Sequence, residues 1–201
     1  MCLGAHADDI EIGCGGTILK LVQDYPDSEF YWVIFSAEGE RVNEAQKSGE
    51  TFLRTIKSKT IEIQDFKDSY FPFYGSEIKD FFVGLKRKFS PDMVITHYGD
   101  DAHQDHKLIS KLTWNAFRDN FIIEYEIPKY DGDLSTPNFF VHLDELLVKE
   151  KISNISRIFL SQKAKPWFDE DSFRAIMRIR GIESNSPSKY AEGFYCRKVI
   201  T

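Results

Sequence analysis

The fold of this protein is decided by its first 23 residues, Met1–Gln23, which read MCLGAHADDIEIGCGGTILKLVQ. The apolar run Met1–Ala5 predicts a strand, a glycine-bearing turn follows it, and the pattern near Thr17–Gln23 predicts an amphipathic helix. A strand followed by a helix is the repeating unit of parallel α/β sheets. The sequence begins inside this strand, so we expect the strand to be truncated at its start.

The same alternation continues along the chain. Further strands are expected at Phe30–Phe35, Thr60–Ile63, Met93–Thr96, Phe121–Tyr125, Phe139–Leu143 and Gly193–Ile200. Further helices are expected at Val42–Ile56, Ser76–Phe89, Gln104–Phe117, Asp144–Ser153 and Asp171–Ile179. The pattern predicts an α/β fold, a Rossmann-like three-layer sandwich with a mostly parallel sheet and right-handed crossovers. No linker or repeat interrupts it, so we expect residues 1–201 to form a single domain.

The composition of the chain argues against some classes of binding partner. The net charge of −6 argues against nonspecific binding to nucleic acid or to anionic membranes. No apolar run approaches the roughly 18 residues of a membrane span, so none is expected. The three cysteines, Cys2, Cys14 and Cys196, are widely separated and include no C-x-x-C pair. This spacing indicates neither a disulfide framework nor a thiolate metal site, and a reducing, cytoplasmic location is expected.

Ligands of open α/β sheets bind beyond the carboxyl ends of the strands. That rule directs attention to the loops Ala5–Gly16, Ser36–Glu44 and His97–His106. The first loop carries His6, Asp8 and Asp9, and the third carries His103, Asp105 and His106.

Two imidazoles and one carboxylate suit a divalent transition metal and leave one coordination position open, as in catalytic zinc sites. His103 and His106 lie three residues apart at an expected helix start, so both rings can point from one face. Asp8 and Asp9 are adjacent, so one carboxylate can bind metal while the other addresses a water molecule. Metal-assisted hydrolysis requires this division of labour.

Four segments resemble the PIG-L/LmbE-like N-acetylglucosaminyl deacetylase family. AHADDIEIGCGGT (5–17) is similar to the family's Ala-His-Pro-Asp-Asp-Glu signature, and HQDH (103–106) to its His-Pro-Asp-His signature. SAEGERVNEA (36–45) is similar to an acidic-Gly-x-Arg segment, and KYAEGF (189–194) to a common family ending. Ala7 stands in place of the usual Pro and Ile10 in place of an acidic residue, with Glu11 beside it.

The resemblance implies removal of an acetyl group from an N-acetylated amino sugar, within a small N-acetylglucosamine-like conjugate, by attack of a metal-bound water. The Zn²⁺ ligands would be His6, Asp9 and His106. Asp8 would be the general base and would later protonate the leaving amine. His103 would stabilise the tetrahedral intermediate and be held by Asp105, and Arg41 would contact sugar or phosphate oxygens of the substrate.

Several of these residues also have structural explanations. His97 and His142 have no motif support, and we expect structural roles for both. Asp100 and Asp101 are as well explained by capping of a helix as by function. Tyr70–Tyr74 is expected to line the core or the rim of a cleft. The glycines 13–16 lack the spacing of a phosphate-binding loop and predict a tight turn.

Two other classes of protein compete with the deacetylase. A non-catalytic nucleotide- or sugar-binding module could use the same fold, although it would need neither Asp8 nor His103. A non-haem iron oxygenase also uses two His and one carboxylate, but its usual β-barrel does not match this α/β pattern. The sequence leaves the identity of the sugar and the oligomeric state open.

Overall fold

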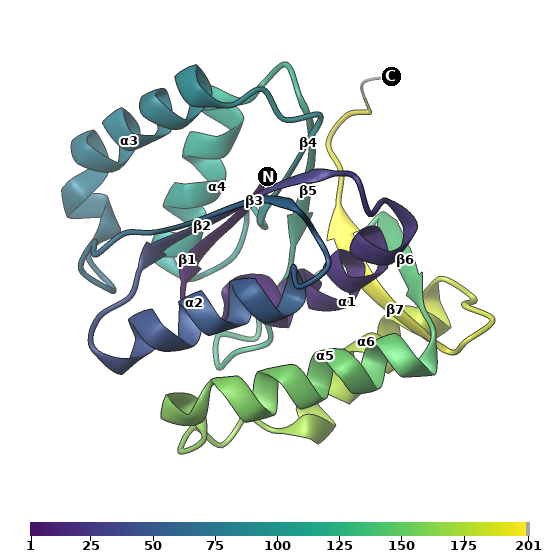
Figure 1. Cartoon of the computed structure of the whole chain (residues 1–201). Helices are drawn as coiled ribbons and strands as arrows, with labels where there is room; N and C mark the ends of the chain where they lie inside the picture. Colours follow the sequence, from purple (N-terminus) through teal and green to yellow (C-terminus); the bar gives the residue numbers. More distant parts are fainter. Residues whose placement is uncertain (200–201) are drawn as a thin grey trace.

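A single sheet of seven strands organises the protein, and the computed structural model describes residues 1–199 (Figure 1). The strands are β1 (Cys2–His6), β2 (Glu29–Ser36), β3 (Ser58–Ile63), β4 (Met93–His97), β5 (Phe121–Tyr125), β6 (Phe139–Leu143) and β7 (Tyr190–Tyr195). Their order across the sheet is β3-β2-β1-β4-β5-β7-β6. β1 to β5 are parallel, whereas β7 runs antiparallel to both of its neighbours, β5 and β6.

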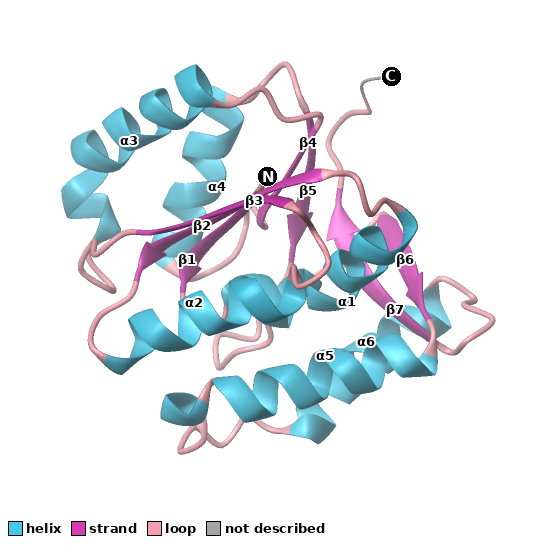
Figure 2. Ribbon diagram, in the orientation of Figure 1, coloured by secondary structure: helices cyan, strands magenta, loops and turns pink. Residues whose placement is uncertain are grey.

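Helices cover both faces of this sheet. They are α1 (Asp9–Asp24), α2 (Glu40–Phe52), α3 (Gly75–Lys88), α4 (Gln104–Ala116), α5 (Glu145–Ile158) and α6 (Glu170–Glu183), with short 3₁₀ turns η1 (Phe71–Tyr74) and η2 (Leu160–Gln162). α3 and α4 lie on one face, and α1, α2, α5 and α6 lie on the other (Figure 2). The predicted three-layer α/β sandwich with a mostly parallel sheet is confirmed.

Alternation along the central strands builds the two halves of the core. Trp32 and Ile34 of β2 pack with α1, α2 and α5, whereas Val33 and Phe35 pack with α3 and α4. Successive side chains of a strand point to opposite faces of the sheet. Both faces are covered here, and the strands therefore read as continuous apolar runs.

The largest difference from the prediction concerns the glycines of the first loop. α1 begins at Asp9, well before Thr17, and Gly13 to Gly16 lie inside it, where Cys14 (φ −143°, ψ 17°) breaks the helical geometry. A Cβ on Gly13 would lie 2.1 Å from Cδ2 of Tyr125, and one on Gly16 would lie 2.4 Å from Cδ1 of Leu143. The glycines permit close packing of a kinked helix on the sheet, so their interpretation as a tight turn was wrong.

Other boundaries differ by a few residues. α5 and α6 extend beyond the expected segments, and each begins at an aspartate that accepts a backbone hydrogen bond, Asp144 from Leu147 and Asp169 from Ser172. The closing strand ends at Tyr195, and Ile200 of the predicted strand lies outside the described residues. Within residues 1–199, no helix combines the length and apolar character needed to cross a bilayer.

The order of the strands fixes where a ligand site can form. The chain moves from β1 outward through β2 and β3, then returns to the other side of β1 as β4. The loops that follow β1 and β4 therefore leave neighbouring carboxyl ends in opposite directions. This is the switch point at which open α/β sheets bind ligands.

Candidate functional site

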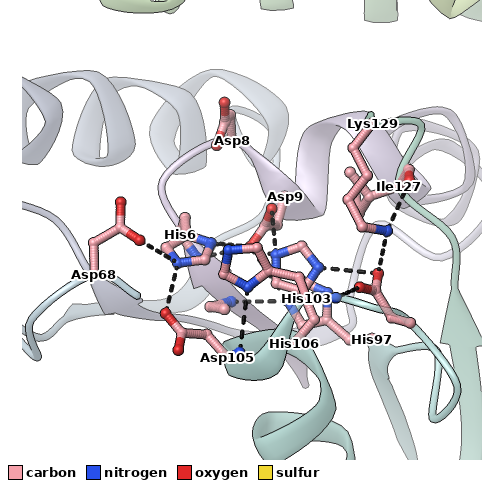
Figure 3. A network of polar contacts seen from close by, with 12 residues as sticks. His6, Asp8, Asp9, Asp68, His97, His103, Asp105, His106, Ile127 and Lys129 are labelled. Carbon is pink, nitrogen blue, oxygen red and sulfur yellow. Dashed lines mark hydrogen bonds and ion pairs between the residues drawn. The ribbon is translucent and has the colours of Figure 1, made fainter. Parts of the chain in front are cut away.

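Histidines and aspartates gather at the switch point (Figure 3). His6 ends β1, Asp9 begins α1, and His106 lies in the first turn of α4. Nδ1 of His6 lies 3.3 Å from Oδ2 of Asp9 and 3.3 Å from Nε2 of His106. Nε2 of His106 lies 3.4 Å from Oδ1 of Asp9. The three residues expected to bind metal thus bring two imidazole nitrogens and the two oxygens of one carboxylate together, a cluster that we call the ligand triangle.

The individual contacts of 3.3–3.4 Å between these residues are close to the spacing of zinc ligands. Tetrahedral Zn²⁺ with bonds of 2.0–2.1 Å holds neighbouring ligand atoms about 3.3 Å apart. All three residues are buried, with at most 7% of their surface exposed. Two imidazole nitrogens and a carboxylate are also the donor set of catalytic zinc sites, with one position left for water or substrate.

Asp105 is directed at His6. Its Oδ2 lies 3.2 Å from Nε2 of His6, and its two oxygens accept the backbone N–H groups of Ser69 (2.7 Å) and Phe71 (3.0 Å). Oδ1 of Asp68 also approaches Nε2 of His6, at 3.1 Å. The expected hydrogen bond between the Asp105 carboxylate and the His103 ring is absent from residues 1–199. The Asp105 carboxylate instead contacts His6, because the amides of Ser69 and Phe71, in the segment between β3 and η1, hold it there.

His103 is fixed by the backbone. Its Nδ1 accepts a hydrogen bond from the backbone N–H of Asp105 at 3.2 Å, so the proton of the neutral ring resides on Nε2. The ring lies 4.5 Å from the ring of His106, centroid to centroid. Burial, together with the neighbouring His106 and His6, lowers the pKa of His103. His103 is therefore a neutral hydrogen-bond donor beside the triangle at neutral pH.

His97 packs against the triangle through the ring of His106. It is fully buried and stacks on His106 with ring centroids 4.0 Å apart, and its Nε2 accepts the backbone N–H of Ala5 at 2.9 Å. Burial and the neighbouring His106 lower the pKa of His97 to about 4, so the ring is neutral at neutral pH. The sequence predicts a structural role for His97, and its burial agrees with that role. Its stacking on His106 nevertheless places the ring directly against the site.

The side chain of Asp8 is paired with Arg41. Its Oδ1 accepts a hydrogen bond of 2.7 Å from Nη2 of Arg41, and in Figure 3 it stands apart from the histidine rings. Burial raises the pKa of Asp8, and the Arg41 guanidinium opposes that shift. Arg41 also lines a cavity of about 390 Å³ between the loops that follow β2 and β3. The other lining residues are Ser36, Ala37, Glu38, Lys67 and Asp68. The cavity thus adjoins both Asp8, through Arg41, and His6, through Asp68.

Protons and a metal ion would compete for the triangle. Burial opposes a charge on His106, but the Asp9 and Asp101 carboxylates outweigh it and raise the pKa of His106 to about 9. The pKa of His6 is likewise raised against the effect of burial, mainly by Asp9. Binding of a metal at these nitrogens must therefore displace protons.

The C-terminal motif KYAEGF supports the site from the far end of the chain. Glu192 accepts the backbone N–H groups of Gly16 (2.8 Å) and Thr17 (2.6 Å) at the kink of α1. Lys151 donates to the carbonyl of Ile12 (2.6 Å) and to Glu192 (2.7 Å). The pair satisfies backbone groups that the kink frees, and it stabilises the helix that begins with Asp9.

Besides His97, whose Nε2 also lies 3.3 Å from Oδ2 of Asp9, Asp68 and Asp101 contact the triangle although the sequence prediction assigned neither of them a function. Asp68 belongs to no motif, yet it follows β3 at the same edge of the sheet, and the rule that selected the other loops could have found it. Asp101 was undecided between capping and function, and its Oδ2 lies 3.0 Å from Nδ1 of His106. Neither Asp100 nor His142 contacts the triangle.

Solved structures of the same fold come from several organisms. The conserved protein TT1542 from Thermus thermophilus is 18% identical, with a TM-score of 0.76 and coverage of 100% of this chain and 94% of that one. N,N'-diacetylchitobiose deacetylase from Pyrococcus horikoshii is 23% identical, with a TM-score of 0.67 and coverage of 96% and 81%. GalB, the 4-carboxy-2-hydroxymuconate hydratase from Pseudomonas putida, is 15% identical, with a TM-score of 0.75 and coverage of 100% and 96%. A deacetylase and a hydratase share this fold, so the fold alone does not fix the reaction.

Among curated proteins no match was found. A family model does match: PIG-L, described as GlcNAc-PI de-N-acetylase, covers residues 1–117. That region contains β1 to β4, α1 to α4 and the whole ligand triangle, and it makes up more than half of the 201-residue chain. The chain therefore belongs to the PIG-L, or GlcNAc-PI de-N-acetylase, family.

Proposed function

We propose that this protein is a zinc-dependent hydrolase that removes the acetyl group from an N-acetylated amino sugar within a small conjugate. One observation carries the proposal: the buried side chains of His6, Asp9 and His106 approach one another to 3.3–3.4 Å, with Asp8 next to Asp9 in sequence and His103 beside His106 in space. Family membership supports de-N-acetylation, and the donor set supports zinc.

A zinc ion bound at the triangle would polarise the amide carbonyl and lower the pKa of a water molecule. Asp8 then acts as the general base. Arg41 occupies its Oδ1, whereas Oδ2 makes no hydrogen bond within residues 1–199 and is free to accept a proton. Asp8 takes the proton from the attacking water and passes it to the nitrogen as the C–N bond breaks. The products are acetate and the free amine.

His103 donates a hydrogen bond to the oxygen that becomes negative. Its Nδ1 is occupied by a backbone N–H, and this leaves Nε2–H as the available donor. The lowered pKa keeps the ring neutral and therefore in this single tautomer. A donor of fixed orientation stabilises developing charge without reorganising during the reaction.

The cavity beside Arg41 and Asp68 is the proposed sugar subsite. A guanidinium supplies donors and a carboxylate supplies acceptors, and together they match the hydroxyl groups of a sugar or, for Arg41, the oxygens of a phosphate. Tyr70, directly before the adjacent η1, and Phe73, within it, are exposed and offer aromatic faces on which a sugar can stack.

Two measurements test the proposal together. Elemental analysis should find about one zinc per chain, lost in His6→Ala and His106→Ala but kept in His142→Ala, since His142 is exposed on β6. The zinc-loaded protein should release acetate from N-acetylated amino sugars. Full zinc occupancy in both ligand variants would refute the site. Tight sugar binding without acetate release would favour the alternative, a non-catalytic sugar- or nucleotide-binding module.

A further inference from the structure

A lysine and an aspartate outside the ligand triangle, Lys129 and Asp101, meet beside His106. Oδ2 of Asp101 lies 3.0 Å from Nδ1 of His106 and 3.0 Å from Nζ of Lys129, and Oδ1 accepts the backbone N–H of His103 at 2.8 Å. Asp101 is 2% exposed. One buried carboxylate therefore contacts both histidines of the HQDH motif and a lysine from a distant loop.

Lys129 is fully engaged within the protein. It lies in the loop between β5 and β6, and its side chain is 10% exposed. Besides Asp101, its ammonium contacts Asp133 and, at 3.4 Å, the carbonyl oxygen of Ile127. Asp133 in turn accepts the backbone N–H of Ala102 at 2.7 Å. These contacts use the three donors of the ammonium and aim it at Asp101, so Lys129 acts through other residues.

The two metal-site histidines are held by different means. His6 contacts Asp105, which is itself fixed by two backbone amides. His106 contacts Oδ2 of Asp101, which is held by the Lys129 ammonium, whereas a single backbone amide, that of His103, holds Oδ1. Removal of the lysine should therefore disturb the His106 corner of the triangle and leave the His6 corner in place.

We infer that Asp101 and Lys129 are positioning residues that fix the tautomer and the orientation of His106 for metal binding. The inference rests on the zinc site of the proposed function. A hydrogen bond from Nδ1–H to a carboxylate leaves the Nε2 lone pair directed at the metal, and such outer partners typically change metal affinity by about 10–100-fold. Lys129 holds the Asp101 carboxylate in place and compensates its buried charge when His106 is neutral and bound to metal. Since Lys129 lies beyond residues 1–117, the part of the chain outside the family match takes part in the metal site.

The test compares Lys129→Met with Lys149→Met. Lys149 is a matched control because its side chain is 63% exposed and makes one long ion pair of 3.8 Å. Zinc affinity is measured by competition with a chromogenic chelator, and ¹⁵N NMR of the zinc-loaded protein reports the tautomer of His106. We expect Lys129→Met to bind zinc about 10–100-fold more weakly and to alter the His106 signals. Lys129→Arg should restore much of the affinity, and Lys149→Met should stay within about twofold of the unmodified protein.

Asp101→Asn gives a second route in case Lys129→Met fails to fold, which circular dichroism would reveal. It keeps the size of the side chain, and it should also weaken zinc binding and change the His106 signals. Unchanged affinity and unchanged His106 signals in the folded variants would overturn the inference. That result, with normal zinc binding and acetate release by the unmodified protein, would leave the proposed function intact. Zinc binding without acetate release would refute the function alone, and absence of zinc binding would refute both.

Discussion

Gly13→Ala should destabilise the protein although alanine favours helices. Gly13 lies in α1 directly against the Tyr125 ring, and an added Cβ would meet Cδ2 at 2.1 Å and Cγ at 2.7 Å. Ordinary carbon contacts begin near 3.5 Å, so the ring must move by more than about 1 Å. Tyr125 is fully buried, and its hydroxyl donates to the carbonyl of Leu3 at 2.8 Å beneath the site.

Three effects determine the change in the free energy of unfolding. One stabilises the folded state and two destabilise it. Replacement of glycine by alanine in a helix interior stabilises by about 1 kcal/mol. Overpacking of a filled core costs about 1–3 kcal/mol. Displacement of the ring also breaks a buried hydrogen bond and leaves polar groups unpaired, at about 1–3 kcal/mol. We expect a net loss near 3 kcal/mol, which lowers the melting temperature of a protein of this size by roughly 6–12 °C.

The assay is thermal and urea unfolding followed by circular dichroism, with Gly84→Ala as the matched control. Gly84 also lies in a helix, α3, but no atom outside its own helix lies within 4 Å of its added Cβ. The control should gain about 0.5–1 kcal/mol. Zinc affinity should fall in Gly13→Ala, since Asp9 begins the same helix. A Gly13→Ala protein that unfolds at or above the temperature of the unmodified protein would refute the packing argument.

Three further predictions concern single side chains. His103→Ala should keep zinc and lose about 10²–10³ in turnover, because it removes a donor to developing negative charge; loss of zinc would make His103 a ligand instead. Asp8→Asn should also keep zinc but lose about 10²–10⁴ in acetate release, compared at equal zinc occupancy, and near-normal rates would exclude Asp8 as the base. Glu11 is fully buried and neither of its oxygens is hydrogen-bonded within residues 1–199, and burial raises its pKa well above the ordinary value. The folded state therefore binds this proton more tightly than the unfolded state, so stability falls as pH rises above the ordinary carboxyl pKa of about 4.3. Glu11→Gln removes the ionisable group and with it this loss of stability at high pH. In urea unfolding, the gain in the free energy of unfolding over the unmodified protein should therefore be larger at pH 8 than at pH 5. An equal gain at both pH values would contradict the account.

Local sequence determined the architecture and the position of the site. Apolar runs of four to six residues separated by amphipathic segments specify buried parallel strands and crossover helices, because each element must bury its apolar face against a neighbour. The carboxyl ends of parallel strands share one edge, so the segments after β1 and β4 had to meet there. For this reason two motifs about a hundred residues apart were expected to meet, whereas the choice of His6, Asp9 and His106 within them came from the family resemblance.

Only the tertiary structure decided which partner each side chain meets. Asp105 contacts His6, and Lys129 reaches Asp101 across 28 positions of sequence. Several carboxylates lie within reach of several imidazoles at this edge, and sequence spacing does not choose among them. The glycines of α1 illustrate the same limit. A turn and a close approach of helix to sheet both require a missing Cβ, and only the position of the Tyr125 ring distinguishes them.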